Sequence, residues 1–202
     1  MNETNEISER HPAQDHHYIT TRSGRRIRMP NIHASQVHLG DIAHSLSNQC
    51  RFQGHTQTYY SVAEHSVLVA DLAEAEGHDE MVVRAALLHD AHEAYLGDFP
   101  SPFKVAVPEL RDFEAQVQTA VLEALGLPPI TDDVWRIVRH FDLDALHLEA
   151  KEFFPAPPDW IDFDRIDAVK GTQRPRGYPP MYAHGMFMQR LRDLGLGLGG
   201  NA

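Results

Sequence analysis

The chain has 202 residues, a length that suits one domain with a buried hydrophobic core. Its net charge of −11 weighs against DNA or RNA as a partner, because binding to such polymers usually rests on Lys and Arg at phosphates. No run of residues approaches the roughly 20 apolar positions that a membrane span needs. Cys50 is the lone cysteine, which excludes an internal disulfide and makes a cytoplasmic location the simplest expectation.

The two ends of the chain are predicted to lie outside the domain. Residues 1–17 are polar, lack an apolar run of signal-peptide type and are expected to be disordered. Residues 18–28 alternate in polarity around Gly24, a pattern that predicts a small β-hairpin. The glycine-rich residues 195–202 are expected to form a flexible tail. We therefore predict a single domain over residues 18–194.

The signals between these ends are mostly helical and predict an all-α fold. Asp41 is a candidate cap for a first short helix. Ser61 and Glu64 have the spacing of a capping box before an apolar run, which Gly77 closes. A later stripe of apolar residues from Val134 to Leu148 has helical spacing. We expect helices at about 41–50, 61–77, 79–96, 109–125, 131–154 and 181–194, and loops at 51–60 and 159–180.

His89 and Asp90 are adjacent in a segment that otherwise has the pattern of a buried helix. A buried carboxylate without a partner is costly, so a divalent cation is a natural way to neutralise Asp90. His65 and Asp142 lie on helices that we expect to pack against this one, and two imidazoles with two carboxylates suit a mid-series divalent metal. Spacing alone leaves this set suggestive, since the chain contains a second such pair at 78–79, where a helix cap is expected.

The order of these residues resembles the H…HD…D pattern of HD-domain metal phosphohydrolases. The sequences of residues 61–66, 87–104 and 142–150 are similar to the signature of bacterial 5′-deoxynucleotidases and their prophage relatives. The resemblance covers about 41–154, the expected core of the domain. It implies an HD-domain helical bundle that binds one divalent metal ion (Zn, Co, Mn, Ni or Fe). The implied metal ligands are His65, His89, Asp90 and Asp142, with Asp144 as a competitor for the last position.

The resemblance also implies catalytic roles for two acidic residues. Glu93 follows His89 by four residues, so a continuous helix would place both on one face. Asp98 lies just past the expected helix end. The matching Glu and Asp of the nucleotidases act as acid or base beside a metal-activated water. The alternatives are a solvated helix residue for Glu93 and a turn former for Asp98. His92 is expected to face solvent, and the alternative is a position next to the metal ligands.

Arg51 and Phe52 precede His65 at nearly the distance of an Arg-Trp pair in the nucleotidases. The resemblance implies that Arg51 binds phosphate through its fork of donors and that the aromatic ring presses on the sugar and excludes a 2′-hydroxyl. This chain departs from that pattern in having Phe52 in place of Trp and a loop one residue shorter. The alternative is a surface arginine beside a core phenylalanine. Weaker candidates for phosphate contacts are Lys104 and His55.

Three functions are compatible with this pattern. The preferred one is a phosphohydrolase that cleaves the phosphate ester of deoxynucleoside monophosphates, with a small nucleotide as partner and no membrane or nucleic-acid polymer. The alternatives are a deoxynucleoside triphosphate triphosphohydrolase of phage type and an inactive HD fold that binds nucleotides. The chain is also expected to form a homodimer or a higher homo-oligomer. Other hydrolase classes lack support, since neither a Gly-x-Ser-x-Gly elbow nor a Walker-type phosphate loop is present.

Overall fold

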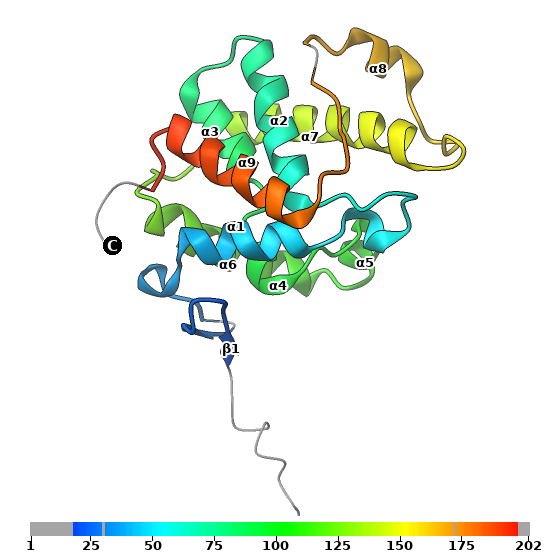
Figure 1. The fold of residues 1–202 in the computed structure, drawn as a ribbon. Coiled ribbons are helices and arrows are strands. Elements are labelled where there is room, and N and C mark those ends of the chain that lie inside the picture. Colours follow the sequence, from blue (N-terminus) through cyan, green and yellow to red (C-terminus); the bar gives the residue numbers. More distant parts are fainter. Residues whose placement is uncertain (1–17, 30, 172, 198–202) are drawn as a thin grey trace, which may run out of the picture.

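The computed structural model describes residues 18–29, 31–171 and 173–197. The described chain folds into a bundle of helices, with a two-stranded antiparallel sheet at one end (Figure 1). The sheet is formed by β1 (Tyr18–Thr20) and β2 (Arg26–Arg28), in the register that pairs Ile19 with Ile27. The predicted all-α fold with a small N-terminal hairpin is therefore confirmed. The expected disorder of 1–17 lies outside the described residues.

The central helix of the bundle is α2, which is buried along almost its whole length and packs against α1, α3, α7 and α9. Each of the longer elements begins and ends within a few residues of its predicted position, with one exception that concerns the candidate site. None of the described helices is both long and apolar enough to cross a bilayer. The helices are α1 (Leu39–Asn48), α2 (Val62–Ala75), α3 (Glu80–Leu88), α4 (Glu93–Leu96), α5 (Ser101–Ala106), α6 (Glu109–Ala124), α7 (Asp132–Phe153), α8 (Phe163–Ala168) and α9 (Pro180–Asp193), with 3₁₀ turns at η2 (Ala34–Gln36) and η3 (Arg51–Gly54).

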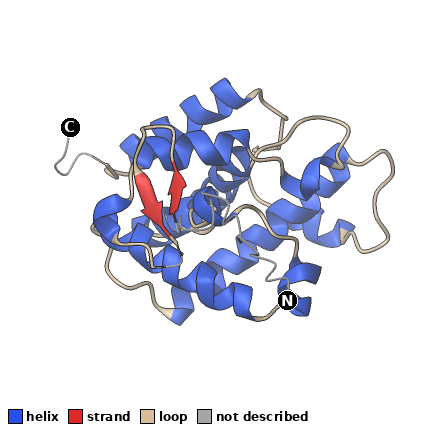
Figure 2. Ribbon diagram, turned by 90° about the horizontal axis from the view of Figure 1, so that it is seen from below, coloured by secondary structure: helices blue, strands red, loops and turns tan. Residues whose placement is uncertain are grey.

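The hairpin is joined to the bundle by the side chain of Asp41. Its carboxylate accepts hydrogen bonds from the Thr21 hydroxyl (2.7 Å) and from the backbone N–H and the hydroxyl of Ser23 (2.9 and 2.6 Å). Asp41 therefore does not cap the first helix as predicted, because α1 begins two residues earlier at Leu39 and the carboxylate turns to the hairpin. The hairpin projects from the lower end of the bundle in Figure 1, and the two strands lie in front of the helices when seen from below in Figure 2.

Two short helices, α5 and α8, occur where the sequence predicts no regular structure. The helix α5 begins between Pro100 and Pro102, since proline is well tolerated in a first helical turn. The helix α8 is capped by Asp162, which accepts from the Arg165 N–H. At the far end, the predicted flexible tail begins too early. Leu196 is buried and its N–H donates to Leu191, so only 198–202 lie outside the described residues.

The carboxylate of Glu64 fastens the segment before α9 to the central helix. Ser61 caps α2 by accepting from the Glu64 N–H, as the predicted capping box requires. The Glu64 side chain does not complete that box. It accepts instead from the backbone N–H groups of Arg176 (2.7 Å), Gly177 (3.1 Å) and Tyr178 (2.7 Å). A buried carboxylate is thereby satisfied by three donors that would otherwise lack partners.

We expect Gly177→Ala to destabilise the protein by about 2–4 kcal/mol, because strain and steric overlap act together. Gly177 has φ +73°, and a Cβ there would lie 2.6 Å from Thr58 Cγ2 and 2.9 Å from the Tyr59 carbonyl oxygen. Gly77 has a similar φ of +83° with nothing within 4 Å, so Gly77→Ala measures the backbone strain alone. Urea unfolding of both variants gives the difference. Equal losses of stability would show that the contact with Thr58 and Tyr59 costs nothing.

Candidate metal centre

Side chains from α2, α7 and the end of α3 converge on one point inside the bundle. The Nε2 atoms of His65 and His89 are 3.2 Å apart. Asp142 Oδ1 lies 3.2 Å from His65 Nε2, and Asp90 Oδ2 lies 3.1 Å from His89 Nε2 and 3.5 Å from His65 Nε2. Donor atoms bound at about 2.1 Å to one ion lie about 3.0–3.4 Å apart at octahedral or tetrahedral angles. Asp142 Oδ1 is farther from His89 Nε2, at 3.8 Å, and the group whose donor atoms all lie within 4.8 Å of one another is His65, His89 and Asp142. These three fit a single mid-series ion, and Asp90 adjoins both imidazoles.

The hydrogen bonds of the two imidazoles leave their Nε2 atoms as electron-pair donors. His65 Nδ1 lies 2.6 Å from Glu149 Oε1, and His89 Nδ1 lies 2.7 Å from the Ala86 carbonyl oxygen. Both partners are acceptors, so each Nδ1 carries the proton and each Nε2 presents a lone pair. Two lone pairs that face each other across 3.2 Å repel unless a proton or a metal ion lies between them. The donor set thus fits a bound divalent metal.

The electrostatics of the cluster keep its carboxylates ionised. Burial raises the pKa of Asp142, but its hydrogen bond to His65 and the charge of His89 outweigh this effect and lower the pKa below its usual range. Burial and Arg51 lower the pKa of His65, yet Glu149 and Asp142 overcome them and raise it to about 9. The surrounding negative charge therefore favours a positive charge at this point, either a proton on His65 or a metal ion in its place.

The structure distinguishes Asp142 from its competitor Asp144. Asp142 faces the imidazoles and belongs with His65 and His89 to a group whose donor atoms all lie within 4.8 Å of one another. Asp144 points to another side of α7, where it forms ion pairs with Arg165 of α8 and with His140. The second His–Asp pair is also not part of the cluster. Its aspartate accepts from the N–H of residue 82 and caps α3.

The helix predicted over 79–96 is interrupted where the ligands lie. The chain turns at 89–92, between α3 and α4, and Gln118 from α6 holds both sides of the turn. Its amide donates to the Leu88 carbonyl (2.8 Å) and accepts from the His92 N–H (3.2 Å). Glu93 therefore does not share a continuous helical face with His89. No glycine or proline marks this break, so the sequence alone could not reveal it.

Glu149 is the residue of this site that the sequence analysis missed. It is fully buried on α7, accepts from His65 Nδ1 and from the Tyr60 hydroxyl (2.8 Å), and pairs with Arg51 Nε (3.1 Å). Its position two helical turns after Asp142, on the same face of the helix, was the available signal. Glu149 orients the His65 ring and neutralises Arg51, which makes it a positioning residue for the cluster.

We expect Glu149→Gln to weaken metal binding about 10- to 100-fold, as is usual when the outer partner of a ligating histidine is lost. The amide keeps the size of the side chain but removes the charge that orients and polarises His65. Metal affinity is measured by competition with a chelator. Glu152→Gln, an exposed position on the same helix, is the matched control. Equal affinity in both variants would contradict the positioning role.

The candidate catalytic acids lie beside the cluster in different environments. Glu93 is buried on α4, and burial together with the charges of Asp90 and Asp98 raises its pKa well above the usual range. Its Oε1 lies 4.0 Å from Lys104 Nζ. Burial also raises the pKa of Asp98, whose backbone carbonyl accepts from Gln53. The alternative of a solvated Glu93 is therefore wrong.

Arg51 lies at the edge of the cluster, and its guanidinium carbon lies over the ring of Phe52, 5.6 Å from the ring centroid. The guanidinium is 3.6 Å from Asp90 Oδ2 and its side chain is 12% exposed, so it is not a surface arginine. Phe52 packs edge-on against Phe154, with ring centroids 5.2 Å apart. Phe52 and Gln53 both have positive φ, 53° and 54°, an uncommon conformation for residues other than glycine. The turn η3 is thus a strained segment next to the site.

His92 is buried, and the prediction that it faces solvent is wrong. Its Nδ1 lies 3.2 Å from Gln118 Oε1, and its Nε2 lies 3.7 Å from Glu114 Oε1. Lys104 also pairs with Glu114, at 2.8 Å. His55, the other weak candidate for phosphate binding, is exposed and lies outside these contacts. The cluster is therefore flanked on the α6 side by a network of fixed charges.

Comparison with known proteins places the chain in a family that fits this site. A family model described as an HD domain matches residues 45–169. The chain is 35% identical to the uncharacterised protein YfdR of Escherichia coli K12 over 179 residues. This alignment covers 88% of this chain and 95% of the relative. It is 37% identical over 156 residues to the uncharacterised protein RCAP_rcc00048 of Rhodobacter capsulatus, covering 73% and 79%. The chain belongs to the HD-domain family, whose members are generally metal-dependent hydrolases.

Proposed function

We propose that this protein hydrolyses the phosphate ester of deoxynucleoside monophosphates in a metal-dependent reaction. The observation that supports it most is the pair of facing His Nε2 atoms, completed by Asp90 and Asp142 and flanked by a buried acid at Glu93. His65, His89, Asp90 and Asp142 would hold one ion, and their two nitrogens and two oxygens suit Zn, Co, Mn, Ni or Fe. The ion would supply Lewis-acid polarisation of a phosphoryl oxygen and of a water.

Arg51, Glu93 and Asp98 provide the phosphate binding and the proton transfers that the reaction needs. Arg51 provides a fixed guanidinium next to Asp90, where its fork of donors can bind phosphate oxygens. Glu93, whose pKa is raised by burial and by the charges of Asp90 and Asp98, can donate a proton to the 5′ oxygen as the bond to phosphorus breaks. Asp98 lies close enough to Arg51 and Asp90 to feel their charges and can accept the proton that the attacking water loses. The products are a deoxynucleoside and inorganic phosphate.

A substrate panel tests this proposal directly. Phosphate release is measured with ribo- and deoxynucleotides, from mono- to triphosphate, in the presence of each of several divalent metals. The proposal requires that deoxynucleoside monophosphates give the highest kcat/KM. Release of tripolyphosphate from triphosphates would favour the triphosphohydrolase instead. Binding of nucleotides without hydrolysis, in protein that retains its metal, would indicate a nucleotide-binding module.

A further inference from the structure

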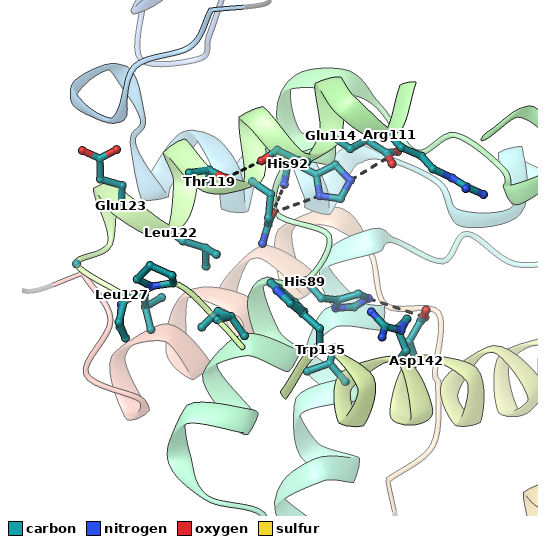
Figure 3. A pocket seen from close by; sticks show the side chains of 18 of the residues that line it. His89, His92, Arg111, Glu114, Thr119, Leu122, Glu123, Leu127, Trp135 and Asp142 are labelled. Atoms are coloured by element: carbon teal, nitrogen blue, oxygen red, sulfur yellow. Dashed lines mark hydrogen bonds and ion pairs between the residues drawn. The ribbon is translucent and has the colours of Figure 1, made fainter. Parts of the chain in front are cut away.

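A large cavity opens directly from the candidate metal centre. It has a volume of about 1320 Å³ and extends between α6 and α7, and His89 and Asp142 are part of its wall. Figure 3 shows His89 near Asp142, whereas Leu127 lies well away from them along the pocket. Pockets for small ligands usually measure about 300–1,000 Å³, so this cavity has room for a whole nucleotide and its hydration.

The wall of the cavity changes character along its length. Near the metal ligands it carries charged groups, among them Lys104 and Glu114, which pair with each other. Farther along it becomes more apolar, with Trp135 of α7 closer to His89 and with Leu122 of α6 and Leu127 farther away (Figure 3). A nucleotide has a similar polarity profile, because its phosphate is charged and the flat faces of its base are apolar.

The spacing of Trp135 and Asp142 on α7 matches the separation of base and phosphate in a nucleotide. Trp135, Val138 and Asp142 follow one another at intervals of three and four residues, so they share one face of the helix. Asp142 lies seven residues beyond Trp135, or about 10 Å along the axis at 1.5 Å per residue. This separation is comparable with the distance from the phosphorus to the base in a nucleoside monophosphate. A phosphate at the metal ligands would therefore bring the base to Trp135.

We propose, building on the proposed function, that the nucleobase of the substrate stacks on Trp135 at the apolar end of the α6–α7 cavity. The deoxyribose then passes beside Val138, and the 5′ oxygen remains at Asp142 and His89. The assignment does not need Phe52, because neither Arg51 nor Phe52 lines this cavity. It thus differs from the sugar contact that the sequence predicts for Phe52.

The polar side chains that line the cavity away from the metal ligands include Gln118 and Thr119, which are already hydrogen-bonded within the protein, and the charged Glu123 and Arg139. The Gln118 amide donates to the Leu88 carbonyl and accepts from the His92 N–H. The Thr119 hydroxyl donates to the Ala115 carbonyl of its own helix. Stacking tolerates all bases, since each presents a π face. The contact with Trp135 therefore retains the base without choosing among the four, and any choice would fall to Glu123 and Arg139.

Kinetics with and without the base test the assignment. The measured quantity is the ratio of kcat/KM for deoxyadenosine monophosphate to kcat/KM for 2-deoxyribose 5-phosphate, which lacks the base. Trp135→Ala should lower this ratio about 5- to 150-fold, the usual range for loss of one stacking contact, mainly through KM. Trp135→Phe should restore most of it. An unchanged ratio in Trp135→Ala, or a loss in Phe52→Ala alone, would overturn the assignment.

The second tryptophan provides the control and a readout that does not need catalysis. Trp160 contacts His147 and does not line the cavity, so Trp160→Phe leaves Trp135 as the single tryptophan of the chain. Deoxyadenosine should quench its fluorescence in the metal-loaded protein, whereas 2-deoxyribose should not. Quenching without hydrolysis of any nucleotide would refute the proposed function and leave the base site standing. Hydrolysis without quenching would refute the base site and leave the function standing.

Discussion

Replacing Asp90 with alanine is expected to remove both the metal and the activity. Asp90 Oδ2 lies within 3.5 Å of both His Nε2 atoms, and its loss leaves the imidazoles with one carboxylate fewer to bind a cation. The charge stabilisation that a metal gives to a transition state amounts to several kcal/mol, so turnover should fall by about 10³-fold or more. Elemental analysis of protein purified without chelator and a phosphate-release assay measure the two effects.

The chain supplies its own control for this experiment. Asp79 also follows a histidine, but it caps α3 by accepting from the Val82 N–H. Asp79→Ala should therefore lose about 0.5–2 kcal/mol of unfolding free energy and retain its metal. If Asp79→Ala lost the metal as Asp90→Ala does, the effect would come from general destabilisation, and Asp90 would have no special claim as a ligand.

A second pair of variants extends the test to the ligand on α7. Asp142→Ala should lose the metal, because Asp142 Oδ1 lies 3.2 Å from His65 Nε2. Asp144→Ala should keep it, since this carboxylate is engaged with Arg165 and His140. The reverse outcome would transfer the fourth ligand position to Asp144.

Replacing Glu93 with glutamine is expected to separate turnover from binding. The amide preserves the shape of the side chain but cannot donate a carboxylic proton, and loss of a positioned acid commonly costs about 10²- to 10⁴-fold in kcat. Metal content and nucleotide affinity should stay near those of the wild type, because Glu93 is not needed to complete the ligand set. Phosphate-release assays measure turnover, and equilibrium binding of the product nucleoside measures affinity.

The matched control for Glu93 is Glu80→Gln, which changes an exposed glutamate on α3 that pairs with Arg84. This variant should turn over at the wild-type rate. A Glu93→Gln protein with activity within a few-fold of Glu80→Gln would remove Glu93 from the mechanism. Loss of metal in Glu93→Gln would show that the residue acts on the cluster and not on the reaction.

Much of this fold follows from local patterns. The hairpin around Gly24 and the longer helices follow from alternation, apolar periodicity and caps such as Ser61 and Asp79, all of which act between residues close in the chain. The convergence of His65, His89 and Asp142 was expected from a resemblance of motifs, and the structure brings the three together. Spacing on separate helices could not by itself have shown which of them meet.

The features that the sequence did not reveal depend on partners distant in the chain. Gln118 breaks the helix at 89–92 from 26 or more positions away, and nothing in the local residues announces it. Glu149 reaches His65 across 84 positions. The short helix α8 has too few residues for a periodic pattern, and its contact with α7 runs through Arg165 and Asp144. In each case, hydrogen bonds or ion pairs between residues distant in the chain determine the structure, and local helix propensity does not reveal them.

The position of Glu64 has a thermodynamic consequence for the whole molecule. It is the neighbour of His65 on α2, and its carboxylate holds the backbone at Arg176–Tyr178, beyond the residues that the family model matches. A ligand that binds only the native state stabilises it by about 4.1 kcal/mol at a thousandfold excess over its Kd. A metal held at His65 would strengthen the attachment of the segment leading into α9 to the extent that detachment of this segment disturbs α2 at His65. By the same linkage, detaching that segment would weaken the affinity for the metal. The attachment of the segment before α9 and the binding of an ion would thus both act through α2.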